Sequence, residues 1–249
     1  GDTIVCLPGH TESVGTTLFP SMPAGTMIVG VGPSDQTTSP TFTFSGATAN
    51  LAVAAANCTI ANMRMLADAD NVTEAITVTA AGFKLIDCFV DLGVAAAQDI
   101  ASFLNFSTGA NDGLVLNNMI RGTAGVQATV IKGGTVVDNL RIVGNRIFSS
   151  STNATTGCIA ITAAMTRLFI AHNYIEALVA ASTSTISFAD VASTGLVTDN
   201  RFAVLADTTV PAGGITLAGT TNILVRFCEN YYSDGVKGTS GLLGPTVTT

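Results

Sequence analysis

The sequence predicts an all-β fold, a right-handed, single-stranded parallel β-helix in which about seven to eight coils of roughly 27 residues stack into a solenoid. Three observations predict this class. A short phrase built around one asparagine recurs at nearly constant spacing. Apolar residues alternate with other residues on both sides of that asparagine, and Thr, Val, Ile and Gly take the place of strong helix formers.

The recurring phrase sets the period of the solenoid. By subtraction, its aligned asparagines lie 27, 28, 27 and 30 residues apart, as expected for one coil per repeat. Two earlier coils fit the same frame, with Cys88 in FKLIDCFV and Met63 in CTIANMRM at the asparagine position. The phrases are LVLNNMI (114–120), LRIVGNRI (140–147), LFIAHNYI (168–175), LVTDNRF (196–202) and LVRFCENYY (224–232), with asparagines Asn118, Asn145, Asn173, Asn200 and Asn230.

Alternating apolar residues flank each asparagine. Leu140 and Ile142 precede Asn145, and Ile147 follows it, which predicts strands with one face toward a shared interior. The alternation breaks at the asparagine, and this break predicts a corner with one residue in the left-handed conformation that Asn tolerates. Stacked coils would place these amides about 4.8 Å apart, close enough to form a hydrogen-bonded ladder.

A further strand is expected before each of these corners. Residues 1–232 then form the β-helix, with an N-terminal coil over 1–45 and further coils over 46–232, and residues 233–249 form a C-terminal cap or a subunit-contact tail. A β-propeller needs a period of about 40 to 45 residues, so it is excluded. The further strands are LAVAA (51–55), ITVTA (76–80), FLNF (103–106), TVIKG (129–133), IAITA (159–163), ISFAD (186–190) and ITLAG (215–219).

The beginning of the chain carries a resemblance to a known superfamily. The segments GDTIVCLPGHTESV (1–14), GTMIVGVGP (25–33) and PTFTF (40–44), followed by V-x-x-N-x-I coils, resemble the pectin-lyase-like β-helix superfamily, and in character the phage-encoded β-helix structural proteins. The resemblance implies the fold and an additional N-terminal module upstream of the GDTI segment. It leaves the function open, because the same scaffold carries lyases, hydrolases, adhesins and phage tail or capsid proteins.

Composition narrows the classes of partner. The 249 residues are 47% hydrophobic and 11% charged, with a net charge of −7, whereas soluble domains are about 25% charged. A nucleic-acid partner is not expected, because phosphate binding needs clustered Lys and Arg. Membrane insertion is not expected either, because no run of about 18 apolar residues occurs. The five cysteines lack a CxxC pair, so we interpret them as small core residues and expect no metal and no cofactor.

One row of residues could support acid and base chemistry. The position just before the ladder should face outward, and there His172, Asp199 and Glu229 fall on three consecutive coils. Two stacked carboxylates beside a histidine could supply the acid and base of glycoside cleavage. The alternative is a surface row whose charges pair with Arg201 and Arg226. The whole row is Asp87, Asn117, Gly144, His172, Asp199 and Glu229.

Two other outward rows are candidate binding surfaces. One step past the corner, Arg146, Tyr174, Arg201 and Tyr231 alternate after Phe89 and Met119, so these arginines and tyrosines are expected either to stack on each other or to hold a sugar ring. Two residues before the corner the row is apolar, although it should face solvent. Such a stripe predicts contact with another subunit, through Ile86, Leu116, Val143 and Ala171, followed by Thr198 and Cys228.

These features predict a non-enzymatic structural virion protein, such as a phage capsid decoration, head-fibre or tail component. It would form a homo-oligomer or bind other virion proteins, and it would lie in a virion or on an extracellular surface. Two alternatives remain open: a polysaccharide-degrading enzyme that uses Asp199, Glu229 and His172, and an adhesin that binds cell-surface glycan along the Arg and Tyr row.

Overall fold

In the computed structural model, all regular secondary structure of the described residues is β-strand. The structure describes residues 1–19, 22–93, 99–122, 129–149, 158–177, 185–189, 192–204, 215–218, 224–233, 240–242 and 246–248. Most strands belong to three long sheets, here called A, B and C. A short pair, β16 (Val137–Asp138) and β20 (Met165–Thr166), lies beside them.

Each long sheet takes one strand from every coil. Sheet A contains β1 (Thr3–Cys6), β4 (Met27–Gly30), β7 (Thr59–Ala61), β10 (Lys84–Ile86), β13 (Leu114–Leu116), β17 (Arg141–Val143), β21 (Leu168–Ala171), β24 (Thr194–Thr198) and β27 (Leu224–Cys228). Sheet B contains β2 (Thr11–Val14), β5 (Thr41–Phe44), β8 (Arg64–Ala67), β11 (Phe89–Asp91), β14 (Met119–Gly122), β18 (Arg146–Ser149), β22 (Tyr174–Ala177), β25 (Arg201–Val204), β28 (Tyr231–Ser233) and β29 (Ser240–Leu242). Sheet C contains β3 (Thr17–Leu18), β6 (Asn50–Val53), β9 (Ile76–Val78), β12 (Ser102–Phe106), β15 (Thr129–Gly133), β19 (Ile159–Ile161), β23 (Ile186–Phe188), β26 (Ile215–Ala218) and β30 (Thr246–Thr248).

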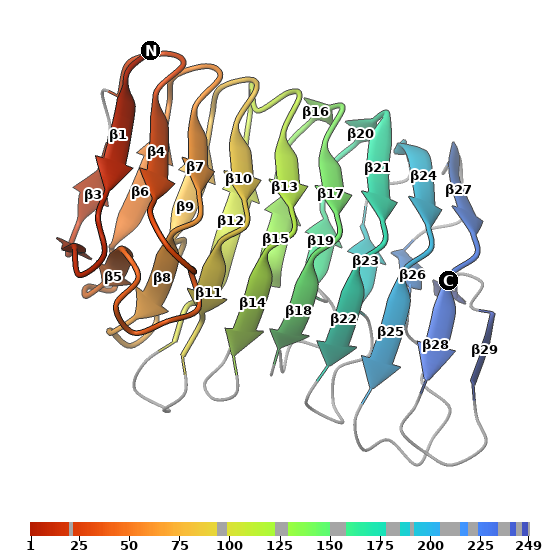
Figure 1. Cartoon of the computed structure of the whole chain (residues 1–249). Helices are drawn as coiled ribbons and strands as arrows, with labels where there is room; N and C mark the ends of the chain where they lie inside the picture. Colours follow the sequence, from red (N-terminus) through yellow and green to blue (C-terminus); the bar gives the residue numbers. More distant parts are fainter. Residues whose placement is uncertain are drawn as a thin grey trace.

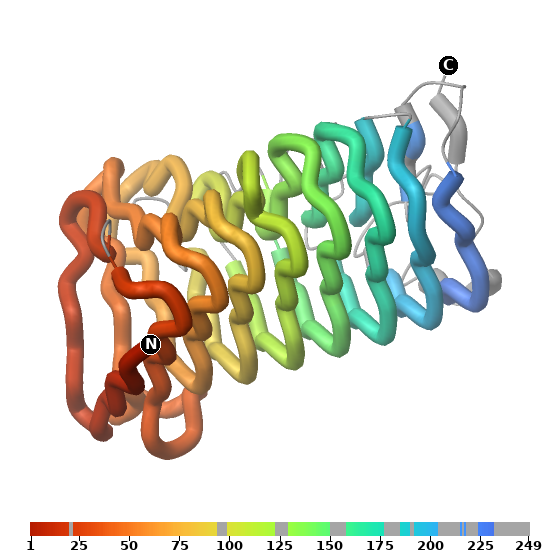
Figure 2. Tube along the Cα trace, turned by 90° about the horizontal axis from the view of Figure 1, so that it is seen from above, coloured from red at the N-terminus to blue at the C-terminus, as the bar shows by residue number. Residues whose placement is uncertain are grey.

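The chain visits sheets A, B and C in turn and then starts the next coil, so the predicted parallel β-helix is confirmed. In Figure 1 the strands of sheets A and B run downward on the near side, those of sheet C run upward behind them, and new coils are added to the right, which is a right-handed path. Figure 2 shows the coils side by side along one axis.

The register of the strands reproduces the sequence period. Val115 pairs with Ile142, Ile142 with Ile170, and Ile170 with Val197, at steps of 27 or 28 residues. Residues one period apart therefore lie directly over one another. Because the same face of the strand points inward in every coil, one pattern of inward and outward residues describes the whole sheet.

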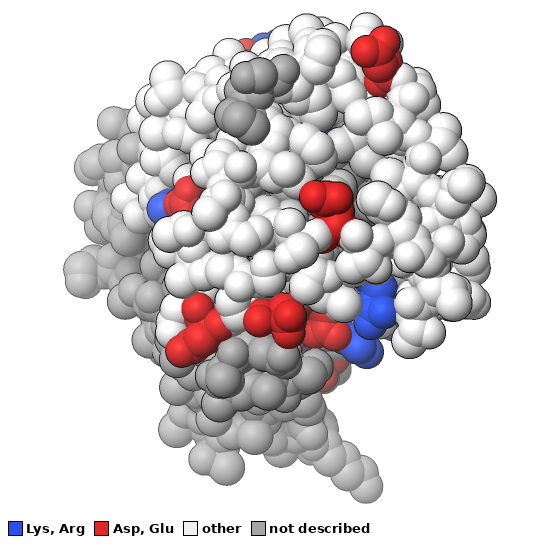
Figure 3. Space-filling model, turned by 90° about the vertical axis from the view of Figure 1, so that its left-hand side faces the viewer, with Lys and Arg blue, Asp and Glu red and all other residues white. Residues whose placement is uncertain are grey.

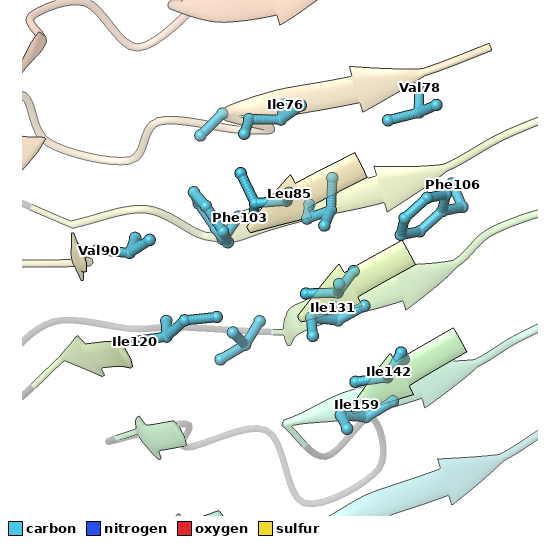
Figure 4. Close-up of a cluster of buried hydrophobic side chains, with 14 of the residues drawn as sticks. Ile76, Val78, Leu85, Val90, Phe103, Phe106, Ile120, Ile131, Ile142 and Ile159 are labelled. Atoms are coloured by element: carbon cyan, nitrogen blue, oxygen red, sulfur yellow. The ribbon is translucent and has the colours of Figure 1, made fainter. Parts of the chain in front are cut away.

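The interior is a continuous apolar column. Figure 4 shows buried side chains of all three sheets in one cluster, among them Leu85 of sheet A, Val90 of sheet B and Ile131 of sheet C. All three are fully buried. Burying an aliphatic side chain of this size contributes about 1.5–3 kcal/mol, so the stacked apolar positions drive the coiling.

The corner between sheets A and B differs from the sequence-based expectation by one residue. The left-handed residue is not the ladder asparagine but the residue before it, with φ values between 52° and 68°. These residues are Asn62, Asp87, Asn117, Gly144, His172, Asp199 and Glu229. The left-handed turn directs the following asparagine into the interior, where Asn118, Asn145, Asn173, Asn200 and Asn230 are at most 1% exposed.

A second row of left-handed corners, which was not predicted from the sequence, lies between sheets C and A. Its members are two glycines and four polar residues of three types, so no single residue type marks the position. The row consists of Gly25, Asn57, Gly82, Asp112, Asn139 and Arg167. Here Asn139 donates to the Asp112 carboxylate of the preceding coil at 2.8 Å, so this corner also carries side-chain hydrogen bonds from coil to coil.

The two ends of the rod differ. At the C-terminal end, β29 pairs antiparallel with β28, and β30 extends sheet C beside β26. At the other end, which faces the viewer in Figure 3, most of the visible surface carries neither positive nor negative side chains. The expectation that all cysteines are core residues is wrong for Cys228, which is exposed, whereas the other four are buried.

Candidate functional site

The asparagine ladder joins the last six coils at the corner between sheets A and B. The Asn145 side-chain amide donates to Asn173 Oδ1 at 2.9 Å and to the Val115 carbonyl at 3.0 Å. Its Oδ1 accepts from both the backbone N–H and the side-chain amide of Asn118 at 2.9 Å. The same pattern continues to Asn200 and Asn230. The ladder is buried and satisfied, so its role is structural: it holds the residues of the corner at fixed height.

A groove of about 330 Å³ lies outside this ladder and brings two of the predicted rows together. His172 and Asp199 reach it from consecutive left-handed corners, and Tyr174, Arg201 and Tyr231 reach it from β22, β25 and β28. The register stacks Tyr174 on Arg201 and Arg201 on Tyr231. The groove therefore combines two aromatic rings, a guanidinium, an imidazole and a carboxylate at coil spacing.

The polar groups of the groove have defined partners. The Tyr174 hydroxyl donates to the Glu176 carboxylate at 2.9 Å. The pKa of the Tyr174 phenol is raised, mainly by partial burial and secondly by its hydrogen bond to the Glu176 carboxylate. The hydroxyl is therefore a hydrogen-bond donor at neutral pH. Asp199 accepts a hydrogen bond from the Thr198 hydroxyl at 3.0 Å. Donors and acceptors about 4.8 Å apart beside exposed ring faces suit a ligand rich in hydroxyl groups.

The predicted catalytic set is brought together in part. His172 and Asp199 line the groove, whereas Glu229 is not among its lining residues and is exposed on the next coil. Within the described ranges, neither Asp199 nor Glu229 forms an ion pair with Arg201 or Arg226. The alternative prediction, a surface row whose charges pair with these two arginines, is therefore wrong about the ion pairs. The groove thus offers one carboxylate where glycoside cleavage uses two.

The Arg and Tyr row is aligned as predicted, but its cation–π contacts are different. The Arg146 guanidinium lies 5.8 Å from the centre of the Phe148 ring, and the Phe148 and Tyr174 rings are 5.7 Å apart. At the described positions, every cation–π contact of this face is with phenylalanine. Arg201 and Tyr231 are exposed, Tyr231 to 52%, which leaves these two side chains open to a ligand.

A second cavity on sheet B, of about 400 Å³, was not predicted. It is lined by Thr43, Arg64 and Asp91 among others. Arg64 and Arg121 both lie over the Phe89 ring, at 5.9 and 4.8 Å from its centre, and Arg121 forms an ion pair with Asp91 at 3.1 Å. Four of the seven arginines of the chain face outward on sheet B, so cations concentrate on this face. They are Arg64, Arg121, Arg146 and Arg201.

The predicted apolar row stands on the outward face of sheet A, which faces the viewer in Figure 1. Ile86, Leu116 and Val143 are half-buried, and Ala171 is fully buried beneath its neighbours. A second outward column, which was not predicted from the sequence, lies two residues earlier on the same strands. This second column contains Met27, Leu114, Phe169 and Leu196.

Comparison with protein-family models, curated proteins and solved structures finds no match. Among the described residues no helix is long and apolar enough to cross a lipid bilayer. In the same part of the chain, no three His, Cys, Asp or Glu side chains lie together in a way that could hold a metal ion.

Proposed function

We propose that this chain is a non-enzymatic structural protein that acts by homo-oligomeric assembly and surface display, as a decoration, head-fibre or tail component of a virion does. The observation that carries the proposal is the outward face of sheet A, where a mostly apolar column runs along the rod beside a second column that mixes apolar and basic side chains. A contiguous apolar patch on a soluble protein marks an interaction site.

The construction of the rod supports this proposal. Parallel backbone pairing connects each coil to the next through all three sheets, and the buried amide ladder adds side-chain hydrogen bonds at one corner. Strand edges remain only at the two ends of a solenoid, so a regular rod of this kind presents few sites for uncontrolled pairing. A rigid body with a defined contact face suits a building block.

Solution mass tests the proposal directly. Light scattering coupled to size exclusion should give a multiple of the 25.2 kDa chain mass, and incubation with a panel of bacterial polysaccharides should release no fragments. A strictly monomeric protein, or fragments whose release is lost in an Asp199→Ala variant, would overturn the proposal. The second outcome would support the polysaccharide-degrading enzyme instead.

Glycan binding is a second candidate, and the groove at the corner between sheets A and B favours it. Tyr174, Arg201 and Tyr231 stand in one column, and aromatic rings with nearby charged hydrogen-bonding groups are suited to hold sugar rings. On a glycan array, Tyr174→Ala and Arg201→Ala should each reduce binding about tenfold, because each removes a contact worth about 1.4 kcal/mol. Arg64→Ala is the matched control, since Arg64 lies on sheet B, as Arg201 does, but does not line the groove.

A further inference from the structure

Two outward columns define the A face, the surface on which the proposed assembly rests. The first column is Met27, Thr59, Lys84, Leu114, Arg141, Phe169, Leu196 and Arg226, and the second is Val29, Ala61, Ile86, Leu116, Val143, Ala171, Thr198 and Cys228. Of these described positions, three carry a positive charge and none carries a carboxylate. The A face is therefore apolar with cations along one side, although the chain as a whole has a net charge of −7.

The carboxylates lie just beyond the other side of the A face, on the left-handed corner row. Lys84 shares its coil with Asp87, and Arg226 shares its coil with Glu229. All four side chains are exposed, and none of them forms an ion pair within the described ranges. Each cation is three residues from its acid along an extended strand, about 10 Å, so the two charges flank the A face without meeting.

We propose that the A face binds a second copy of this chain, with the two-fold axis parallel to the rod. This inference rests on the proposed assembly function and names its partner. Such an axis keeps each coil at its own height and reverses the strand direction. It places the first column of one copy over the second column of the other and brings Lys84 to Asp87 of the second copy and Arg226 to Glu229 of the second copy.

The apolar residues also match under this symmetry. Leu114 faces Leu116 of the second copy, and the large Phe169 ring faces the small Ala171 side chain. Facing sheets lie about 10 Å apart, a distance that lysine and arginine side chains can span to a carboxylate. An axis along the strands would instead reverse the order of the coils and place cations over the first column of the other copy, so the charge pattern selects the axis along the rod.

The size of the A face is compatible with a dimer. Nine strands about 4.8 Å apart, each with about four residues of about 3.3 Å, give on the order of 600 Å² per copy. Standard interfaces bury about 800 Å² per partner. Ser34 donates to the Asp87 carbonyl at 3.0 Å and so lies against this corner, and the Asp87 side chain remains exposed.

Charge exchange tests the symmetry by sedimentation equilibrium. Lys84→Glu should weaken dimerisation at least tenfold, because it sets two carboxylates against each other, and adding Asp87→Lys in the same chain should restore the wild-type affinity. Leu116→Lys should abolish the dimer, whereas Arg146→Glu on the outward face of sheet B should not change it. Far-ultraviolet circular dichroism confirms that each variant is folded.

The outcomes separate this inference from the proposed function. If the wild type is oligomeric but Leu116→Lys has no effect, or if the double exchange fails to restore affinity, the A-face dimer is refuted and assembly must use another surface. A trimeric mass would refute the two-fold axis. A monomeric wild type would refute both the dimer and the assembly function.

Discussion

Removing one amide from the ladder should cost far more stability than its size suggests. Asn145 is completely buried, donates to Asn173 Oδ1 and to the Val115 carbonyl, and accepts two hydrogen bonds from Asn118. In Asn145→Ala the backbone N–H of Asn118 loses its acceptor inside the protein. A buried unsatisfied group costs about 1–3 kcal/mol, and each lost hydrogen bond contributes about 1 kcal/mol, so unfolding should be easier by about 3–5 kcal/mol.

Urea unfolding followed by circular dichroism measures this change, with Asn117→Gly as the matched control. Asn117 is the neighbouring residue, but its side chain is exposed and its φ is +55°. Glycine adopts this conformation without the penalty of a Cβ atom, so the control should equal the wild type or exceed it by up to about 1 kcal/mol. A loss below about 1 kcal/mol in Asn145→Ala would refute the view that the ladder is an energetic element of the fold.

Three further results are expected. Gly195→Ala should destabilise the fold by about 2 kcal/mol or more in the same urea assay, because φ is +147° and a Cβ would lie 2.1 Å from a backbone carbonyl oxygen. Hydrogen bonds from Arg167 lower the pKa of Asp138 to about 2, so the stability from this pair is present above about pH 4 and is lost as the pH falls toward 2; the difference in Tm between wild type and Asp138→Asn should shrink over that range. Burial raises the pKa of Cys88 to about 12, so a disulfide reagent at pH 8 should label exposed Cys228 quickly and Cys88 only after unfolding, as mass spectrometry can map.

The fold could be predicted because the buried positions repeat the same few residue types, aliphatic residues and asparagine, with one constant period. Buried stacks of Ile, Leu and Val at steps of 27 or 28 residues fix which residues lie over one another. A buried asparagine that recurs at one position, such as Asn145 or Asn173, finds its side-chain partners in its copies on the neighbouring coils. Both signals recur in several coils, so a coil that departs from the pattern does not obscure the period.

The corner geometry could not be predicted to the residue. The left-handed position accepts Asn, Asp, Gly, His and Glu in this chain, so its composition carries little signal, whereas the conspicuous asparagine beside it is an ordinary inward residue. Similarly, the first column of the A face mixes Leu114 with Lys84 and Arg141, and this mixture resembles a normal solvated strand until the register places the residues together. The groove could not be predicted from the sequence, because it depends on the exact positions of the corner row and of the Arg and Tyr row along the rod.

The left-handed corners also indicate where side-chain identity matters. Asparagine and aspartate tolerate positive φ, and glycine adopts it freely, but His172 at +57° and Glu229 at +53° each cost about 1–2 kcal/mol relative to glycine. Gly144 occupies the same position at +68°, so the corner accepts glycine. Both strained residues lie next to a candidate surface. His172 lines the groove, and Glu229 is on the same coil as Arg226, at the edge of the A face. Because glycine is accepted at this corner, the strain at His172 and Glu229 makes these two side chains the ones to test first, His172 for the proposed glycan binding and Glu229 for the proposed dimer.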